Sequence, residues 1–161
     1  PSERVDTAEW LAEFPNLVIT RTFSKIYGLA GLRVGYAMAS AEVADLMNRV
    51  RQPFNCNNLA IAAAAAALGD EEFVARSYAL NRAGMEQIVA GLKRLGYAHI
   101  PSSGNFLAFK AGDAAALNQK LLKQGVIVRP VAGYGMPEWL RVTIGSENEN
   151  ARFLEALELA Q

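Results

Sequence analysis

The sequence is poor in the residues that build disulfides and zinc sites. Its 161 residues include one cysteine, Cys56, and one histidine, His99. Disulfide scaffolds and protein zinc sites need several such side chains, so we predict neither a secreted, oxidised protein nor a metal site. Cys56 stands among asparagines with no histidine or second base nearby, and we interpret it as a structural thiol. We interpret His99 as a packing or surface residue.

The chain also lacks an excess of charge and a long apolar run. Sixteen Lys and Arg balance sixteen Asp and Glu, for a formal net charge of +0. Readers of nucleic acids and membrane surfaces need a basic excess, so we predict neither partner. The most apolar run, residues 59–68, is much shorter than a membrane span of about 20 residues. With no signal-peptide pattern at the start, the sequence favours a cytoplasmic protein.

What the sequence does contain is a mixture of helix and strand patterns typical of an α/β protein. We predict a short helix from Asp6 to Pro15 and a continuous β-branched strand over 17–20, buried on both faces as in parallel sheets. The other elements predicted in the first half are a strand over 33–38, a helix over 41–51, a buried alanine-rich helix over 59–68 and a long helix over 71–95 with a break near Gly84.

The final third has the pattern of a compact α+β unit. We predict strands over 97–100, 106–110, 126–129 and 140–144, and helices over 114–123 and 147–160. Ser146 and Glu149 form a capping-box pattern at the start of the last helix. We place a domain boundary in the long helix and assign residues 1–85 to one domain and 86–161 to the other.

The loop between the first two strands carries the most informative side chains. Lys25 lies in the loop that comes directly after the predicted strand, and loops at strand ends are where α/β proteins bind ligands. A lysine amine can form a Schiff base with an aldehyde, and a nearby hydroxyl and guanidinium, Ser24 and Arg33, suit a phosphate. The alternative is that Lys25 is a solvated loop lysine and Arg33 an ion-pair partner, and a lone lysine after a strand does not exclude it.

The whole string from Ser24 to Tyr36, S-K-I-Y-G-L-A-G-L-R-V-G-Y, resembles the lysine segment of class I/II, fold-type I aminotransferases that use pyridoxal phosphate (PLP). The resemblance implies the end of the large PLP-binding αβα domain followed by a small α+β domain. It also implies that Lys25 binds PLP and moves the proton during catalysis. Ser24 and Arg33, and with less support Thr22, then bind the cofactor phosphate.

A second cluster of candidate site residues lies in the final third. Arg141 enters an otherwise apolar strand, where a guanidinium is costly unless it meets an anion. In the family the matching arginine binds the substrate's anionic group; the alternative is an interdomain salt bridge. Arg129 resembles an arginine that holds a substrate phosphate, or it is a solvated arginine at a strand end. Asn105 resembles a position that faces the site, or it fixes a turn.

Within the family, several stretches are most similar to the histidinol-phosphate aminotransferases of histidine biosynthesis. These are R-Q-P-F-N-C-N, S-G-N-F-L, G-V-I-V-R-P and L-R-V-T-I-G-S. The resemblance implies a homodimer that acts on a phosphorylated small molecule with glutamate or 2-oxoglutarate. Aromatic aminotransferases and threonine-phosphate decarboxylase share the lysine segment and remain alternatives, as does a non-catalytic α+β module.

The chain departs from the family in length. In the family an aspartate that pairs with the pyridine nitrogen, and other cofactor ligands, precede the lysine segment, whereas only 24 residues precede Lys25 here. We therefore expect a C-terminal half that does not transaminate by itself. Whether it retains PLP is open.

Overall fold

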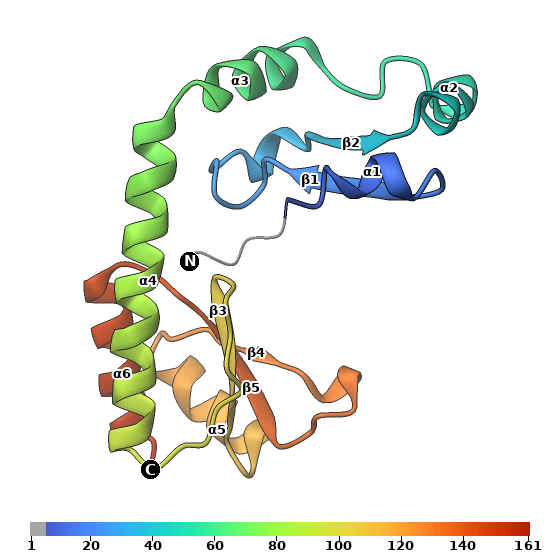
Figure 1. Ribbon diagram of the computed structural model, residues 1–161. Helices are drawn as coiled ribbons and strands as arrows, with labels where there is room; N and C mark the ends of the chain where they lie inside the picture. The colour runs from blue at the N-terminus through green and yellow to red at the C-terminus, as the bar shows by residue number, and fades with distance from the viewer. Residues whose placement is uncertain (1–5) are drawn as a thin grey trace. The chain divides into compact units, whose positions relative to one another are not determined.

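The computed structural model describes residues 6–161, and the chain divides into two compact units. The first unit ends at Ala75, and the second runs from Arg76 to Gln161. The division falls inside the long helix α4 (Glu71–Arg94), which is labelled in Figure 1. The assignment of residues 1–85 and 86–161 to a large and a small domain stays a prediction.

The first unit contains short helices and one pair of strands. The elements before α4 are α1 (Trp10–Glu13), β1 (Val18–Thr22), the 3-10 helix η1 (Ala30–Leu32), β2 (Gly35–Ala39), α2 (Ala41–Val50) and α3 (Asn58–Leu68). The first helix begins later than predicted because the Asp6 carboxylate accepts the Ala8 N–H and closes a turn before it. Ser40 and Asn57 cap α2 and α3 with side-chain oxygens.

The predicted parallel, fully buried strand is wrong. β1 pairs with β2 in an antiparallel register from Val18 opposite Ala39 to Thr22 opposite Gly35, and of the β1 side chains only Ile19 is buried. The reason lies in the connection, residues 23–34, which contains turns and η1 but no crossover helix. Parallel neighbours need a crossover, whereas a short loop joins antiparallel ones.

The alanine-rich helix α3, which was predicted to be buried, is buried on one side only. Ala60 and Ala64, one turn apart, contact Phe23 and Val34 in a small core, and the other alanines are exposed or half-buried. This core includes the two residues at the base of the loop that carries Lys25, so packing against α3 stabilises the loop.

The second unit is a three-stranded antiparallel sheet with helices on one side. After α4 come β3 (Phe106–Lys110), α5 (Ala114–Lys123), β4 (Arg129–Pro130), the 3-10 helix η2 (Ala132–Tyr134), β5 (Trp139–Thr143) and α6 (Glu147–Leu159). The strand order is β3-β5-β4 (Figure 1). Two predicted strands are shorter than expected: residues 97–100 form only a bridge between His99 and Phe109, and β4 begins at Arg129.

Strand alternation decides which face of this sheet is buried. Successive side chains point to opposite faces, so one face carries Leu107 and Phe109 of β3 with Leu140 and Val142 of β5. All four are buried among apolar residues of α4, α5 and α6. The opposite face carries Phe106 and Ala108, with Arg141. The helices therefore fill one side of the sheet, and its other side presents the predicted substrate arginine.

The predicted break near Gly84 is wrong, because α4 is continuous through it. Gly84 serves packing instead: a Cβ atom there would lie 2.6 Å from the Ile144 methyl group Cγ2. A side chain at Gly91 would likewise collide with Leu154 of α6. The two glycines thus let α6 and the strand before it approach α4 closely, side by side as in Figure 1.

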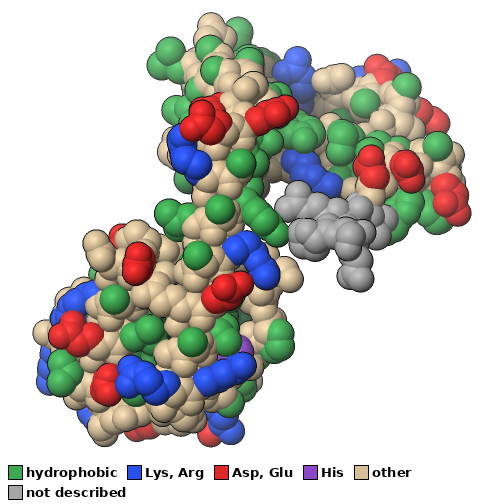
Figure 2. All heavy atoms as spheres, turned by 60° about the vertical axis from the view of Figure 1, so that its left-hand side comes forward, with side chains coloured by type: hydrophobic (Ala, Val, Ile, Leu, Met, Phe, Trp, Pro, Cys, Tyr) green, Lys and Arg blue, Asp and Glu red, His purple; other side chains and the backbone are tan. Residues whose placement is uncertain are grey.

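The predicted capping box at the start of α6 is confirmed. Ser146 accepts the Glu149 N–H, and the Glu149 carboxylate accepts the N–H of Ser146. The hydrogen bond from the Ser146 backbone lowers the pKa of the Glu149 carboxyl. Among residues 6–161, no helix is both long and apolar enough to cross a bilayer. Figure 2 shows acidic and basic side chains interspersed on the face in view.

Candidate functional site

The loop that carries Lys25 is closed at its base by the buried side chain and backbone of Phe23. The Phe23 N–H donates to the Val34 carbonyl at 3.2 Å, and the Phe23 carbonyl accepts the Leu29 N–H at 3.0 Å. The Phe23 ring lies 4.9 Å from the Tyr27 ring, centroid to centroid. Tyr27 therefore packs inside the loop, and the loop has a defined shape.

Lys25 lies at the tip of this loop and is exposed to solvent. Its carbonyl accepts the Gly28 N–H at 2.9 Å, which closes a turn. Gly28 has a φ of +70°, a conformation that residues with a Cβ rarely adopt. Among the described residues no carboxylate forms an ion pair with the Lys25 ammonium. The amine is thus free to react with a ligand.

Of the three predicted phosphate ligands, Ser24 and Arg33 lie on this loop, and Thr22 is the last residue of β1 just before it. The Thr22 hydroxyl accepts the Ser24 N–H at 3.1 Å, so Thr22 and Ser24 are in contact. Arg33 does not start the second strand as predicted: it has a φ of +53°, and its guanidinium donates to the Ala30 carbonyl at 2.9 Å. Ser24 and Arg33 flank the Phe23–Val34 hydrogen bond at the base of the loop.

In the second unit, Arg141 lies on the open face of the sheet with an unusual environment. Its guanidinium carbon is 4.4 Å from the centroid of the Phe106 ring. Its Nε is buried and has no hydrogen-bond partner among the described residues. An unpaired buried donor costs about 1–3 kcal/mol. The structure therefore holds this guanidinium with a buried N–H group that has no partner among the described residues.

Arg129 is the cross-strand neighbour of Arg141 in β4 and β5. Directly opposite residues of an antiparallel pair project from the same face, and like charges in such positions repel. The Arg129 guanidinium donates to the Tyr134 hydroxyl at 3.5 Å. Two guanidinium groups held side by side suit an anion that both can bind.

A groove of about 300 Å³ runs past Arg141, lined by Phe106, Tyr134 and Met136 among others. Asn105 is exposed and does not line it; its carbonyl accepts the Ile144 N–H at 2.8 Å and so extends the strand pairing. Neither Phe106 nor Tyr134 is among the site residues predicted from the sequence, and Tyr134 is 68% exposed. Alternation in β3 and β5 would have placed Phe106 on the Arg141 face.

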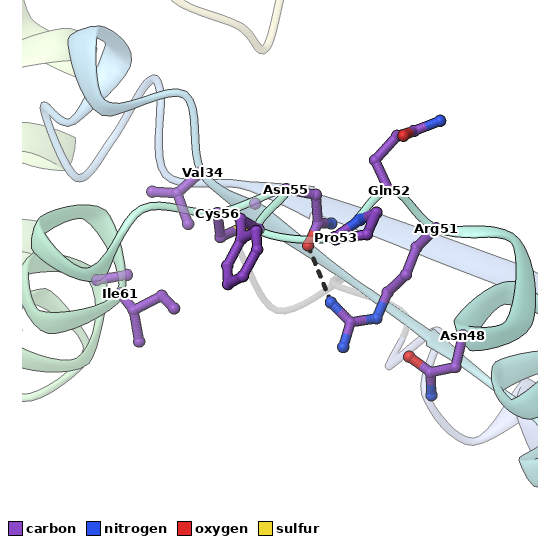
Figure 3. A pocket seen from close by; sticks show the side chains of 11 residues that line it. Val34, Asn48, Arg51, Gln52, Pro53, Asn55, Cys56 and Ile61 are labelled. Atoms are coloured by element: carbon purple, nitrogen blue, oxygen red, sulfur yellow. Dashed lines mark hydrogen bonds between the residues drawn. The ribbon is translucent and has the colours of Figure 1, made fainter.

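A cavity of about 760 Å³ lies elsewhere, in the first unit. Figure 3 shows Arg51 and Asn55 at its edge, joined by a hydrogen bond of 3.0 Å, with Val34, Cys56 and Ile61 nearby. None of the residues predicted to bind cofactor or substrate lines it.

The first unit of this α/β protein carries an exposed lysine on a closed loop, and the second unit carries two cross-strand arginines on the open face of its sheet. The chain matches the family "Aminotransferase class I and II" over residues 2–157, and it belongs to this family. The family resemblance proposed from the lysine segment is therefore confirmed.

The similar curated proteins are longer than this chain. "Histidinol-phosphate aminotransferase 1" of Dechloromonas aromatica is 78% identical over 160 residues, which cover 99% of this chain and 44% of that protein. "Histidinol-phosphate aminotransferase 1" of Thiobacillus denitrificans is 62% identical over 157 residues, covering 98% and 41%. The chain thus spans less than half the length of these relatives.

Solved structures show the same fold. The histidinol-phosphate aminotransferase of Sinorhizobium meliloti, solved with pyridoxal-5'-phosphate, superposes with a TM-score of 0.89 at 29% identity, over 99% of this chain and 45% of that one. L-threonine-O-3-phosphate decarboxylase of Porphyromonas gingivalis gives a TM-score of 0.83 at 27% identity, over 98% and 50%. The predicted α/β fold class is confirmed.

Proposed function

We propose that this chain supplies the cofactor lysine and the substrate arginines of a PLP-dependent aminotransferase that converts histidinol phosphate and 2-oxoglutarate to imidazole acetol phosphate and glutamate. The observation that carries the proposal is the exposed Lys25 side chain on a closed loop, with no ion-pair partner among residues 6–161, in a chain 78% identical to a protein named for this reaction. We further propose a cytoplasmic homodimer in which residues 1–85 belong to the large domain and 86–161 to the small one.

The residues of the loop fit PLP by the chemistry of their donors. Lys25 offers an amine for the aldehyde, and the Ser24 hydroxyl and the free N–H groups of Arg33 offer hydrogen bonds for the phosphate. Thr22 is a weaker candidate; its hydroxyl accepts the Ser24 N–H and keeps its own O–H as a donor. When bound, PLP supplies an electron sink for the bond-breaking step. The Lys25 amine then carries a proton from one substrate atom to the next.

On the other unit, Arg141 and Arg129 suit a substrate with a strong anionic group. A guanidinium can bind a phosphate through two parallel hydrogen bonds, and a second one opposite it neutralises more of the charge. In the proposal Arg141 and Arg129 orient the substrate through their guanidinium groups. Asn105 stays a weaker proposal, since only its backbone carbonyl has a contact here.

A segment exchange tests the proposed reaction. The matching segment of the Dechloromonas aromatica protein is replaced by this chain, and transamination of histidinol phosphate with 2-oxoglutarate is measured. We expect a rate within about tenfold of that of the unaltered relative, because 78% of the exchanged residues are identical. We expect the 161-residue chain alone to show no turnover.

The outcomes separate the proposal from its alternatives. Turnover by the isolated chain at the rate of the exchanged protein would contradict the expected inactivity. An exchanged protein that releases carbon dioxide from threonine phosphate, and does not transaminate histidinol phosphate, would favour a decarboxylase, a candidate supported by the likeness to the Porphyromonas gingivalis enzyme. Preference for aromatic amino acids would favour an aromatic aminotransferase. A folded but inert protein would favour a non-catalytic module.

The exposed apolar side chains of the first unit predict that the isolated chain self-associates. Val50 is 79% exposed and Phe54 is 97% exposed, and Leu46 and Met47 on α2 are exposed as well. Apolar groups left in water favour contact with a second copy. We expect a sedimentation coefficient that rises with protein concentration, and a clear reduction of this rise in a Val50→Ser, Phe54→Asn double variant.

Asparagine suits position 54 because Phe54 has a φ of +57°, which asparagine tolerates. Leu159→Ser is the matched control, since Leu159 is also exposed but lies on α6 in the second unit. A wild-type chain that stays monomeric at every concentration contradicts the prediction. So does a control variant that abolishes association as completely as the double variant.

A further inference from the structure

The Phe106 ring lies on the open face of the sheet, where an apolar side chain gains little from packing. Phe106 is 40% exposed. By contrast, Leu107 of β3 and Val142 of β5, which point to the opposite face of the sheet, are buried. Its one recorded ring contact is with the guanidinium of Arg141 at 4.4 Å. The ring's position is thus explained by Arg141 and not by the core.

We infer that Phe106 is a positioning residue that holds the Arg141 guanidinium ready for an anion. The inference rests on the proposed role of Arg141 and adds a residue to it. In the register, Arg141 is opposite Ala108, so Phe106 is its diagonal neighbour on the same face. The small Ala108 side chain leaves space for the guanidinium to lie across the ring.

A ring orients a guanidinium without using up its donors. The face of the ring is electron-rich and attracts the cation, but it takes up only one face of the guanidinium plane. The N–H groups point outward in that plane and stay available. An aspartate or glutamate would hold the arginine equally well, yet it would occupy those donors and neutralise the charge. No ion pair to Arg141 or Arg129 is found within residues 6–161.

Arg129 has a matching arrangement. The Tyr134 hydroxyl accepts one of its N–H groups at 3.5 Å, an uncharged partner that leaves the charge in place. Both cross-strand arginines are thus restrained by aromatic side chains and not by carboxylates, and both charges remain to bind the same anion. The Arg141 Nε is itself buried, so such an anion would meet the guanidinium at its other N–H groups.

The test uses the 161-residue chain and inorganic phosphate, followed by the NMR signals of the arginine Nε–H groups. We expect phosphate to shift the Arg141 signal in the wild type. Phe106→Leu keeps an apolar side chain but removes the ring face, so Arg141 gains rotamers that binding must restrict. We expect its phosphate dissociation constant to rise about two- to tenfold. Phe106→Tyr restores the ring and should stay within about twofold of the wild type.

The control is Phe14→Leu, since Phe14 is 46% exposed and lies in the first unit. A second readout does not depend on phosphate: the ring should displace the Arg141 side-chain proton signals upfield in the wild type and in Phe106→Tyr, but not in Phe106→Leu. Equal phosphate affinity in the wild type and Phe106→Leu, or no ring-dependent displacement, overturns the inference. If phosphate does not shift the Arg141 signal of the wild type, the role of Arg141 in the proposed function is overturned instead.

Discussion

Lys25→Ala is expected to abolish transamination in the exchanged protein described above. Loss of the proton-transferring amine alone should lower the rate by about 10²–10⁴-fold. Loss of the covalent attachment of PLP adds to this. Lys25→Arg should be equally inactive, because a guanidinium keeps the positive charge but does not react with the aldehyde. The rates are measured as kcat at saturating histidinol phosphate.

Lys123→Ala serves as the control for the lysine variants. Lys123 is exposed near the end of α5 and is not a predicted site residue. We expect its kcat to stay within about twofold of the parent, as for most surface substitutions. An active Lys25→Arg variant would show that charge, and not a covalent bond, is what the reaction needs from this residue. That result would remove Lys25 from its proposed role.

Phe109→Ala is expected to cause the largest loss of stability in the second unit. Phe109 is 0% exposed, and its ring lies edge-on to Tyr97 and Phe153 at 5.7 and 5.8 Å. Truncating a buried phenylalanine costs about 3–5 kcal/mol through lost burial and the cavity left behind. This is a large share of the 5–15 kcal/mol typical of a whole domain. The lost packing would also loosen the sheet that carries Arg141.

The free energy of unfolding is measured in urea by tryptophan fluorescence. The chain has two tryptophans, so a Trp10→Phe background leaves Trp139 of β5 as the probe of the second unit. Ile127→Ala is the control, because Ile127 is 84% exposed and should change stability by less than about 0.5 kcal/mol. A Phe109→Ala cost below about 1 kcal/mol would contradict the described core.

Local signals in the sequence predicted most helices and the capping box, because caps and apolar periodicity depend on residues near one another in the chain. Strand pairing is different, since it depends on partners far along the sequence. The run 17–20 looks like a parallel strand from its composition alone, but β1 is antiparallel because of the short connection that follows it. From the sequence, Gly84 likewise looks like a helix breaker. The structure shows instead that Ile144 lies too close for a residue with a Cβ atom at this position.

The candidate site, too, could be predicted only where its residues are close together in the sequence. Lys25, Ser24 and Arg33 could be chosen from one continuous motif, since they share a single loop. The pairing of Arg129 with Arg141 could not, because the strand predicted over 126–129 does not reveal its partner, and β4 in the structure contains only Arg129 and Pro130. Phe106 was missed because its role depends on the register of β3 against β5. These are tertiary relations that residue types alone do not specify.

The central claim is that Lys25 reacts selectively with PLP, and covalent trapping tests it most directly. The 161-residue chain is treated with limiting PLP, reduced with borohydride, digested with trypsin and analysed by mass. Lys25 is the only lysine before Lys93, and its modification blocks cleavage so that the label stays on peptide 22–33. The account predicts that this peptide carries most of the label. An even distribution over Lys25, Lys93, Lys110, Lys120 and Lys123 would contradict it.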